Sequence, residues 1–198
     1  KMLTQEHRIQ LMRDTYLEVN LDALARNTRT LKQEIGPDVA LCAVVKANAY
    51  GMGAAQVAQV LLDNGAELLA VANLLEAVAL KRMNAQWPVW VMGHTPEDLI
   101  PLAIDHHIML TLSTWEQGLA VNNYAASVNR VHSVQVKFDT GFNRLGFQDK
   151  EKDRQQMIQL LDLPHVAVKG IFSHLALASK EEDCIQKNKL MSLKQMIF

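Results

Sequence analysis

The residue of this sequence best placed to do chemistry is a lysine at the end of an apolar run. Residues 41–46 are strand-forming residues that end in Lys46, and the glycine-bearing turn at 47–53 contains Asn48 and Tyr50. A buried ammonium group is costly unless it is paired or loses its proton, and a neutral lysine amine attacks carbonyl groups. The alternative is that Lys46 ends the strand and extends to water. This stretch alone leaves both interpretations open.

Further candidates stand at the ends of two later apolar runs. Residues 134–139 alternate in polarity, so Lys137 and Asp139 share one face of the predicted strand. An ion pair between them would explain a second buried cation, and a role in a site is the other explanation. The two-glycine loop that follows returns Arg144 to the strand end. His174 ends another apolar run, where it is either a core histidine or a site residue.

Short apolar strands alternate with amphipathic helices along the chain. Strands are expected at 15–21, 41–46, 68–72, 88–92, 108–112, 131–139 and 166–174. Helices are expected at 23–35, 54–63, 74–83 and 149–161, and also after Pro96, after Ser113 and from Ser179. The alternation is typical of a parallel β/α fold, and both a doubly wound sheet and a (β/α)8 barrel fit it.

Polar residues are expected at the helix starts and at the strand ends. The predicted caps are Asp22, Thr95, Ser113 with Glu116, Asp149, and Ser179 with Glu182. In parallel β/α folds, ligands bind at the carboxyl ends of the strands. Besides the residues above, this rule selects Asn73, His94, Thr111 and Ser113. The adjacent His106 and His107 are expected on the surface.

The composition excludes several function classes. The 198 residues are 49% hydrophobic and 21% charged with a net charge of −1, so a globular protein with no nucleic-acid partner is expected. No apolar segment is long enough to cross a bilayer. Cys42 and Cys184 form neither a disulfide framework nor a metal site, which favours a cytoplasmic setting. Zinc-ligand spacing, a P-loop and a complete dinucleotide fingerprint are absent from the sequence.

Three segments taken together resemble the alanine racemases, pyridoxal-phosphate enzymes whose N-terminal domain is a (β/α)8 barrel. They are AVVKANAYG at 43–51, VKFDTGFNRLG at 136–146 and GIFSHLA at 170–176. The resemblance runs from about Tyr16 to the end, although many members have histidine where Met52 stands. It implies an α/β, TIM-type barrel truncated to about six β/α units. Residues 22–198 would be this partial barrel, and 1–21 an arm and strand of a C-terminal β domain that is missing.

The resemblance also implies a role for each candidate. Lys46 would bind pyridoxal 5'-phosphate covalently and act as one of two acid/base groups. Tyr50 would help hold the cofactor phosphate, and His174 would stack against or orient the pyridine ring. Arg144 would face the pyridine or phenolic oxygen and contribute to binding the substrate. Lys137 matches a lysine that is often carbamylated in the family.

The activity implied is interconversion of L-alanine and D-alanine for the bacterial cell wall, by a homodimer and without a metal. The second base would be a tyrosine from the partner's β domain, so the chain alone is expected to be inactive or nearly so. The alternatives are a serine racemase domain, another barrel-type pyridoxal-phosphate enzyme such as a decarboxylase, and a non-catalytic pyridoxal-phosphate homeostasis protein. A structural fragment without ligand is the simplest alternative.

Overall fold

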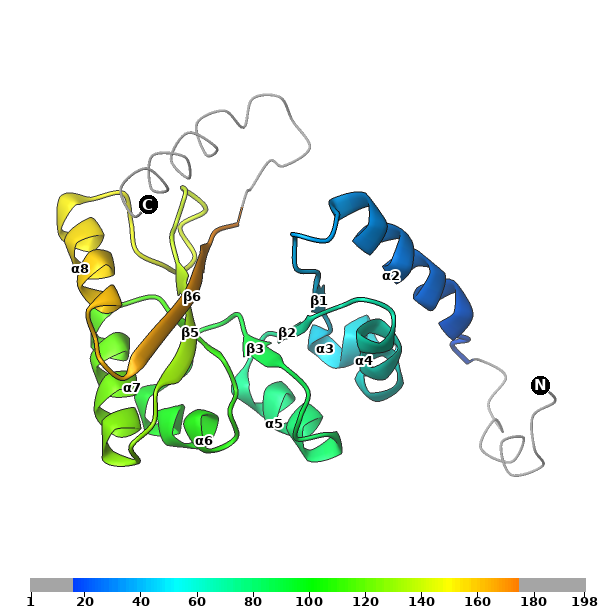
Figure 1. Cartoon of the computed structure of the whole chain (residues 1–198), viewed down its shortest axis with the longest axis horizontal. Helices are drawn as coiled ribbons and strands as arrows, with labels where there is room; N and C mark the ends of the chain where they lie inside the picture. Colours follow the sequence, from blue (N-terminus) through cyan, green and yellow to red (C-terminus); the bar gives the residue numbers. More distant parts are fainter. Residues whose placement is uncertain (1–15, 175–198) are drawn as a thin grey trace.

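The computed structural model describes residues 16–174, which form parallel strands flanked by helices (Figure 1). The strands are β1 (Cys42–Val44), β2 (Leu68–Val71), β3 (Val89–Val91), β4 (Leu110–Leu112), β5 (His132–Lys137) and β6 (Val166–Phe172). The helices are α2 (Leu21–Ile35), α3 (Lys46–Tyr50), α4 (Ala54–Asp63), α5 (Leu74–Met83), α6 (Ile100–Asp105), α7 (Trp115–Ser127) and α8 (Glu151–Leu161), with a 3-10 turn η1 (Glu97–Leu99). The predicted parallel α/β fold is confirmed.

The strands follow one another in space in the order of the chain. β1, β2 and β3 form one parallel sheet, and β4, β5 and β6 form a second. Met109, just before β4, joins the two: its N–H donates to Val89 O, and Val91 N–H donates to its carbonyl, both at 2.9 Å. A doubly wound sheet reverses its strand order at a switch point. The sequential order of the described strands therefore fits a barrel wall and not a doubly wound sheet.

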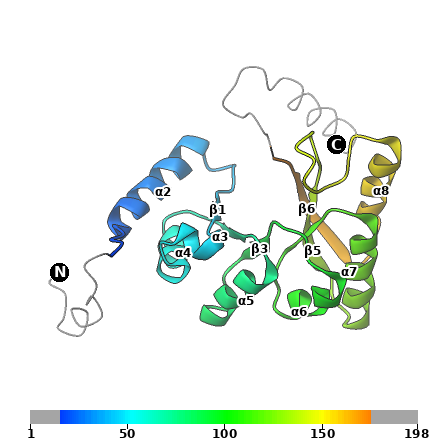
Figure 2. The ribbon, with the colours of Figure 1, turned by 180° about the vertical axis from the view of Figure 1, so that it is seen from behind.

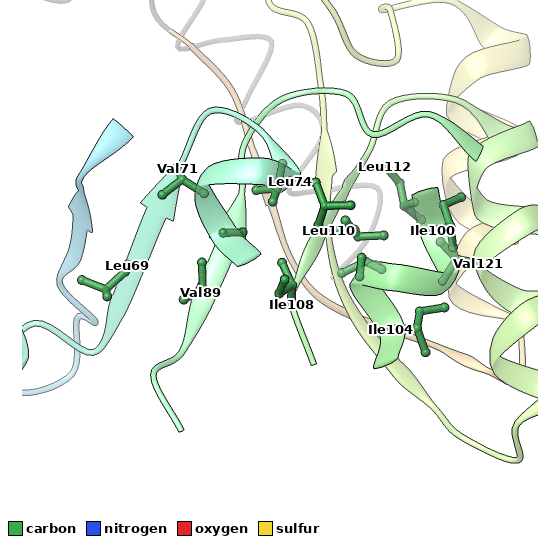
Figure 3. Close-up of a cluster of buried hydrophobic side chains, with 14 of the residues drawn as sticks. Leu69, Val71, Leu74, Val89, Ile100, Ile104, Ile108, Leu110, Leu112 and Val121 are labelled. Atoms are coloured by element: carbon green, nitrogen blue, oxygen red, sulfur yellow. The ribbon is translucent and has the colours of Figure 1, made fainter. Parts of the chain in front are cut away.

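The hydrophobic core lies between the strands and the helices that cover them. Figure 3 shows side chains from β2, β3 and β4 facing those of α5, α6 and α7. The labelled residues are all at most 5% exposed: Leu69, Val71, Leu74, Val89, Ile100, Ile104, Ile108, Leu110, Leu112 and Val121. Helices α7 and α8 cover the β4–β6 sheet on its outer side (Figure 2). This layer of helices leaves the carboxyl ends of the strands free to form a site.

The strand predicted at 15–21 does not form in the part that the structure describes. Residues 16–20 have no regular structure, and Tyr16 and Leu17 are 66% and 68% exposed. An alternating sequence becomes a strand only where a neighbour supplies hydrogen bonds, and no strand of residues 16–174 pairs with this segment. Instead Asn20 caps α2 by accepting from Ala23 N–H at 2.8 Å, so the cap predicted at Asp22 is wrong.

Two other predicted caps are displaced by one residue. Thr114, not Ser113, caps α7 by accepting from Gln117 N–H at 3.2 Å. The Ser113 hydroxyl instead donates to the Gln117 side chain at 2.8 Å. Lys150 occupies the N-cap position of α8, while Asp149 forms an ion pair with Arg154. Adjacent polar residues compete for one position, and the backbone angles decide which of them fills it.

The remaining predicted helix starts have different outcomes. The helix predicted after Pro96 begins as the 3-10 turn η1 and continues as α6. The predicted cap Thr95 is buried, and no side-chain cap bond forms at this start. The capping box predicted at Ser179 and Glu182 lies outside the described residues. His106 and His107 are exposed, as predicted.

The segment labelled α3, which follows β1, is a left-handed turn and not a regular α-helix. Ala47, Asn48, Ala49 and Tyr50 have φ between 51° and 55°, and Gly51 follows with φ 87°. For L-residues with a Cβ this conformation costs about 1–2 kcal/mol each, so it forms only where the surroundings compensate. Ala49 supplies part of the compensation, since its side chain is 1% exposed in the core.

The left-handed turn predicts an unusual response to glycine. Ala47 is exposed, so Ala47→Gly relieves strain without opening a cavity. We expect the free energy of unfolding to stay unchanged or to rise by up to about 1 kcal/mol in urea titrations. The matched control is Ala79→Gly, at an exposed position inside α5, which should lose about 1 kcal/mol. Equal losses in the two variants would show that Ala47 is not left-handed in solution.

His132 is a buried, neutral histidine at the start of β5. It is 5% exposed, and its Nε2–H donates to Ile108 O at 3.0 Å. Burial lowers the pKa of His132 to about 4, because the charged ring is poorly solvated there, and the Ile108 carbonyl opposes this shift only in part. The unfolded chain, with a histidine pKa of about 6.5, therefore binds a proton between pH 6.5 and 4 that the folded chain does not.

This histidine makes stability fall in mild acid. Above about pH 6.5 the neutral His132 costs the folded state nothing. As the pH falls from there to 4, the free energy of unfolding decreases by about 3 kcal/mol, because only the unfolded chain takes up the proton. We expect His132→Gln to flatten the plot of unfolding free energy against pH over this window, measured by urea titration. His106→Gln, at an exposed position, should keep the slope of the unaltered chain. The same slope in both variants would contradict the assignment.

Candidate active site

The five residues to which the family resemblance assigns a role surround one cavity of about 460 Å³ at the carboxyl ends of the strands. Its lining comes from the ends of β1, β2, β3, β5 and β6 and from the loop after β5. The lining residues are Val44, Lys46, Tyr50, Ala72, Met92, Gly93, Lys137, Arg144, Leu145, Phe172, Ser173 and His174. The structure therefore brings together Lys46 and His174, which are 128 positions apart in the chain.

The charge on the cavity wall has one sign. Lys46, Lys137 and Arg144 contribute cationic groups, and no carboxylate is among the described residues that line the cavity. Cationic side chains gathered in a cleft with apolar walls attract anions. The cavity therefore favours a ligand with a phosphate or carboxylate group.

Lys46 enters the cavity directly from the end of β1. Val45, the residue before it, is 2% exposed, and its N–H donates to Ala70 O on β2 at 2.8 Å. The left-handed turn begins at Ala47, directly after Lys46. The Lys46 Nζ lies 6.0 Å from the centre of the Tyr50 ring, which is 61% exposed at the other end of the turn. One short turn thus supplies both an amine and a phenol.

Lys137 is the buried cation of the cavity. It is 4% exposed, its Nζ donates to Phe138 O at 2.8 Å, and it lies 5.5 Å from the centre of the Phe172 ring. Burial lowers the pKa of Lys137, Arg144 lowers it further, and Asp139 opposes both. A lysine in this setting holds its proton less tightly than a lysine in water does.

Asp139 does not form the simple ion pair that could have explained Lys137. No ion pair within 4.0 Å joins the two among residues 16–174. Asp139 Oδ1 instead accepts from Gly141 N–H at 2.8 Å and from Asn143 N–H at 3.1 Å. Its carboxylate therefore shapes the loop that carries Arg144.

The same loop is closed tightly over Lys137 by a glycine. Gly146 has φ +118°, and a Cβ there would lie 2.8 Å from Lys137 Cγ and from the Lys137 carbonyl oxygen. Phe147 N–H then donates to that carbonyl at 2.9 Å. Only glycine fits this approach, so the second glycine of the loop is a requirement of the site's geometry.

Two residues that sequence reasoning missed connect the loop to the end of β6. The Phe142 ring lies 4.7 Å from Arg144 Cζ and meets the His174 ring edge-on, with centres 4.8 Å apart. Thr140 Oγ1 is 2.9 Å from Ser173 Oγ and donates to His174 O at 3.3 Å. The position of Phe142 and Thr140 near Arg144 in the sequence is the feature from which they could have been predicted as site residues.

The other strand-end candidates do not line the cavity. Asn73 caps α5 by accepting from Glu76 N–H at 3.1 Å. Thr111 accepts from the Trp90 ring N–H at 2.9 Å and donates to Val91 O at 2.7 Å. The buried Gln117 side chain bonds to the other two: its Nε2 lies 2.9 Å from His94 Nδ1, and its Oε1 accepts from the Ser113 hydroxyl at 2.8 Å. All four of these candidates therefore have structural partners.

Residues 16–174 contain neither a metal-binding cluster nor a membrane-spanning helix. No cluster of three or more His, Cys, Asp or Glu side chains in this range could hold a metal ion. None of the described helices has the length and apolar character to cross a membrane.

Known sequences identify the family. The model of the alanine racemase N-terminal domain matches residues 19–197. Alanine racemase of Clostridium tetani is 36% identical over 176 residues, which cover 89% of this chain and 45% of that protein. Alanine racemase 1 of Bacillus subtilis is 38% identical over 172 residues, which cover 86% of this chain and 43% of that protein. The chain thus spans somewhat less than half the length of these relatives.

Solved structures agree with the sequence matches. Alanine racemase of Clostridium difficile in complex with cycloserine superimposes with a TM-score of 0.83 at 32% identity, covering 90% of this chain and 49% of that one. Alanine racemase of Bacillus anthracis with bound L-Ala-P gives a TM-score of 0.83 at 31% identity, and the match covers 92% of this chain and 48% of that one. The chain belongs to the alanine racemase family, and the part of the family that it matches is the N-terminal domain.

Proposed function

We propose that this chain is the N-terminal part of an alanine racemase and that its strand-end cavity holds pyridoxal 5'-phosphate on Lys46. The observation that carries the proposal is the convergence of Lys46, Lys137 and Arg144 on one cavity. The whole protein interconverts L-alanine and D-alanine as a homodimer. Cycloserine and L-Ala-P, bound in two similar structures, support a small amino acid as the substrate.

The residues present fit this cofactor. A cavity of about 460 Å³ is within the usual size of a small-molecule site. Lys46 offers the amine that an aldehyde requires, and Tyr50 offers a donor for the phosphate. Arg144 would face the phenolic oxygen or the pyridine side of the cofactor, and His174 would stack against its ring or orient it. When bound, pyridoxal phosphate acts as an electron sink that makes the Cα–H bond of the amino acid acidic.

Racemisation requires one proton carrier on each face of the substrate. Lys46 removes or returns the proton at Cα on the face from which it enters the cavity. Following the family, the opposite face receives a tyrosine from the β domain of the partner chain. Arg144 also contributes its charge to binding the substrate carboxylate. Because only one of the two carriers belongs to this chain, racemisation by the chain alone is slow.

Lys137 acts as a carbamate in this proposal. The Lys137 ammonium first releases one proton, and the free amine then attacks the carbon of carbon dioxide, so that a nitrogen–carbon bond forms as one C=O bond opens to an oxygen anion. A second proton leaves the nitrogen, so an anion replaces the cation and two protons go to solvent. The lowered pKa of Lys137 and its burial support this reaction, since both favour the neutral amine. The anion would then pair with Arg144 and hold its guanidinium in place at the cavity.

The architecture is part of the same proposal. Residues 22–198 form about six units of a (β/α)8 barrel, and residues 1–21 are an arm and segment that joins a β domain. The sequential, parallel order of the described strands supports a barrel wall. In the dimer, the β domain of one chain covers the cavity of the other.

The proposal predicts that the chain binds the cofactor but hardly turns over alanine. With pyridoxal phosphate and L-alanine in deuterated water, we expect D-alanine formation at least about a hundredfold slower than by a complete racemase, because one general base is missing. Chiral chromatography measures the product, and proton NMR measures exchange at Cα.

The control for this experiment is a complete alanine racemase under the same conditions. Turnover by the chain at a comparable rate would contradict the division of the site between two domains. If Lys46→Ala left the slow residual reaction unchanged, it would contradict the assignment of Lys46 as a proton carrier.

A further inference from the structure

Glu76, in the first turn of α5, holds two strand ends with one carboxylate. Its Oε1 accepts from Ala47 N–H at 2.9 Å, and its Oε2 accepts from Ala72 N–H at 2.9 Å. Its own N–H donates to Asn73 Oδ1 at 3.1 Å, which fixes it at the start of the helix. The carboxylate thus connects the residue that follows Lys46 with the residue that follows β2.

This connection begins where the pairing of β1 with β2 ends. The last hydrogen bond between them along the chain runs from Val45 N–H to Ala70 O at 2.8 Å. Lys46 comes next, and Ala47 is then bound by Glu76. Lys46 is therefore held on both sides, and both attachment points belong to β2 and α5.

A carboxylate suits this position better than other side chains. Each of its oxygens accepts a separate hydrogen bond, and the negative charge strengthens both. Ala47 is exposed and left-handed, so neither packing nor backbone preference fixes it. A glutamine has only one oxygen, and its NH₂ group would face one of the two N–H donors.

We propose that Glu76 is a positioning residue that directs the Lys46 amine into the cavity. The proposal rests on the proposed function for the identity of the ligand, because the amine is directed toward the cofactor aldehyde. Lys46 and Ala72 both line the cavity, so one carboxylate also fixes the spacing of two of its walls. Glu76 itself is not among the residues that line the cavity, and it acts through the backbone.

The test compares Glu76→Gln with Glu116→Gln. Glu116 is an exposed acid in the first turn of α7, so its substitution removes the same charge from a helix start without touching the cavity. Titration of the chain with pyridoxal phosphate, followed by absorbance, should show about tenfold weaker binding for E76Q, the change expected when one charge-assisted hydrogen bond is lost. E116Q should bind as the unaltered chain does.

Hydrogen exchange of the Ala47 and Ala72 amides tests the connection without the cofactor. Both should be protected in the unaltered chain, and at least one should exchange about tenfold faster in E76Q. If circular dichroism shows that E76Q is unfolded, Glu76→Asp replaces it, since it keeps the charge but is too short to reach both amides.

Three results would overturn the proposal. An unprotected Ala47 amide in the unaltered chain would show that the connection does not exist. Equal cofactor affinity in E76Q and E116Q would show that it exists without positioning Lys46. If the unaltered chain binds no pyridoxal phosphate, the proposed function fails together with the positioning role. Protection of the Ala47 and Ala72 amides in that case would show that Glu76 has a structural role alone.

Discussion

The site depends on how the backbone leaves β1 at Lys46. Up to Val45 the chain is held by pairing with β2, and from Ala47 it runs through a left-handed turn that L-residues adopt at a cost. The turn places Lys46 and Tyr50 at opposite ends of one short segment beside the cavity. If the backbone continued in a right-handed conformation, the Lys46 and Tyr50 side chains would lie in different positions relative to each other. The strain therefore begins at the residue directly after Lys46, which carries the proposed chemistry, and strained backbone is common at functional sites.

A second constraint is the accumulation of positive charge opposite that turn. Lys137 is buried without an ion pair to Asp139 among the described residues, and Gly146 brings the Arg144 loop close against it. An arrangement of this kind is unfavourable until an anion balances it. The cofactor phosphate, the substrate carboxylate and a carbamate on Lys137 each provide such an anion. The proposed function thus explains a cost that a purely structural cavity would leave unexplained.

Much of this organisation could be predicted from the sequence because it depends on local periodicity. The six strands from β1 to β6 and helices α4 and α5 follow the apolar pattern. The strand-end rule selected Lys46, Tyr50, Lys137 and His174, and the two-glycine loop added Arg144. The strand at 15–21 failed because alternation does not supply a hydrogen-bonding neighbour. The hand of the turn after Lys46 also escaped prediction, since alanine and tyrosine do not signal positive φ. Phe142 and Glu76 were missed because their contacts form only in three dimensions.

The central claim is that Lys46, rather than the other lysine of the cavity, carries the cofactor. The most direct measurement is to add pyridoxal phosphate to the chain, reduce the complex with borohydride and locate the modified lysine by peptide mass spectrometry. We expect modification at Lys46, which should be lost in Lys46→Arg and kept in Lys81→Arg, because Lys81 is a buried lysine outside the cavity. Modification at Lys137 in the unaltered chain, or undiminished modification of Lys46→Arg, would contradict it.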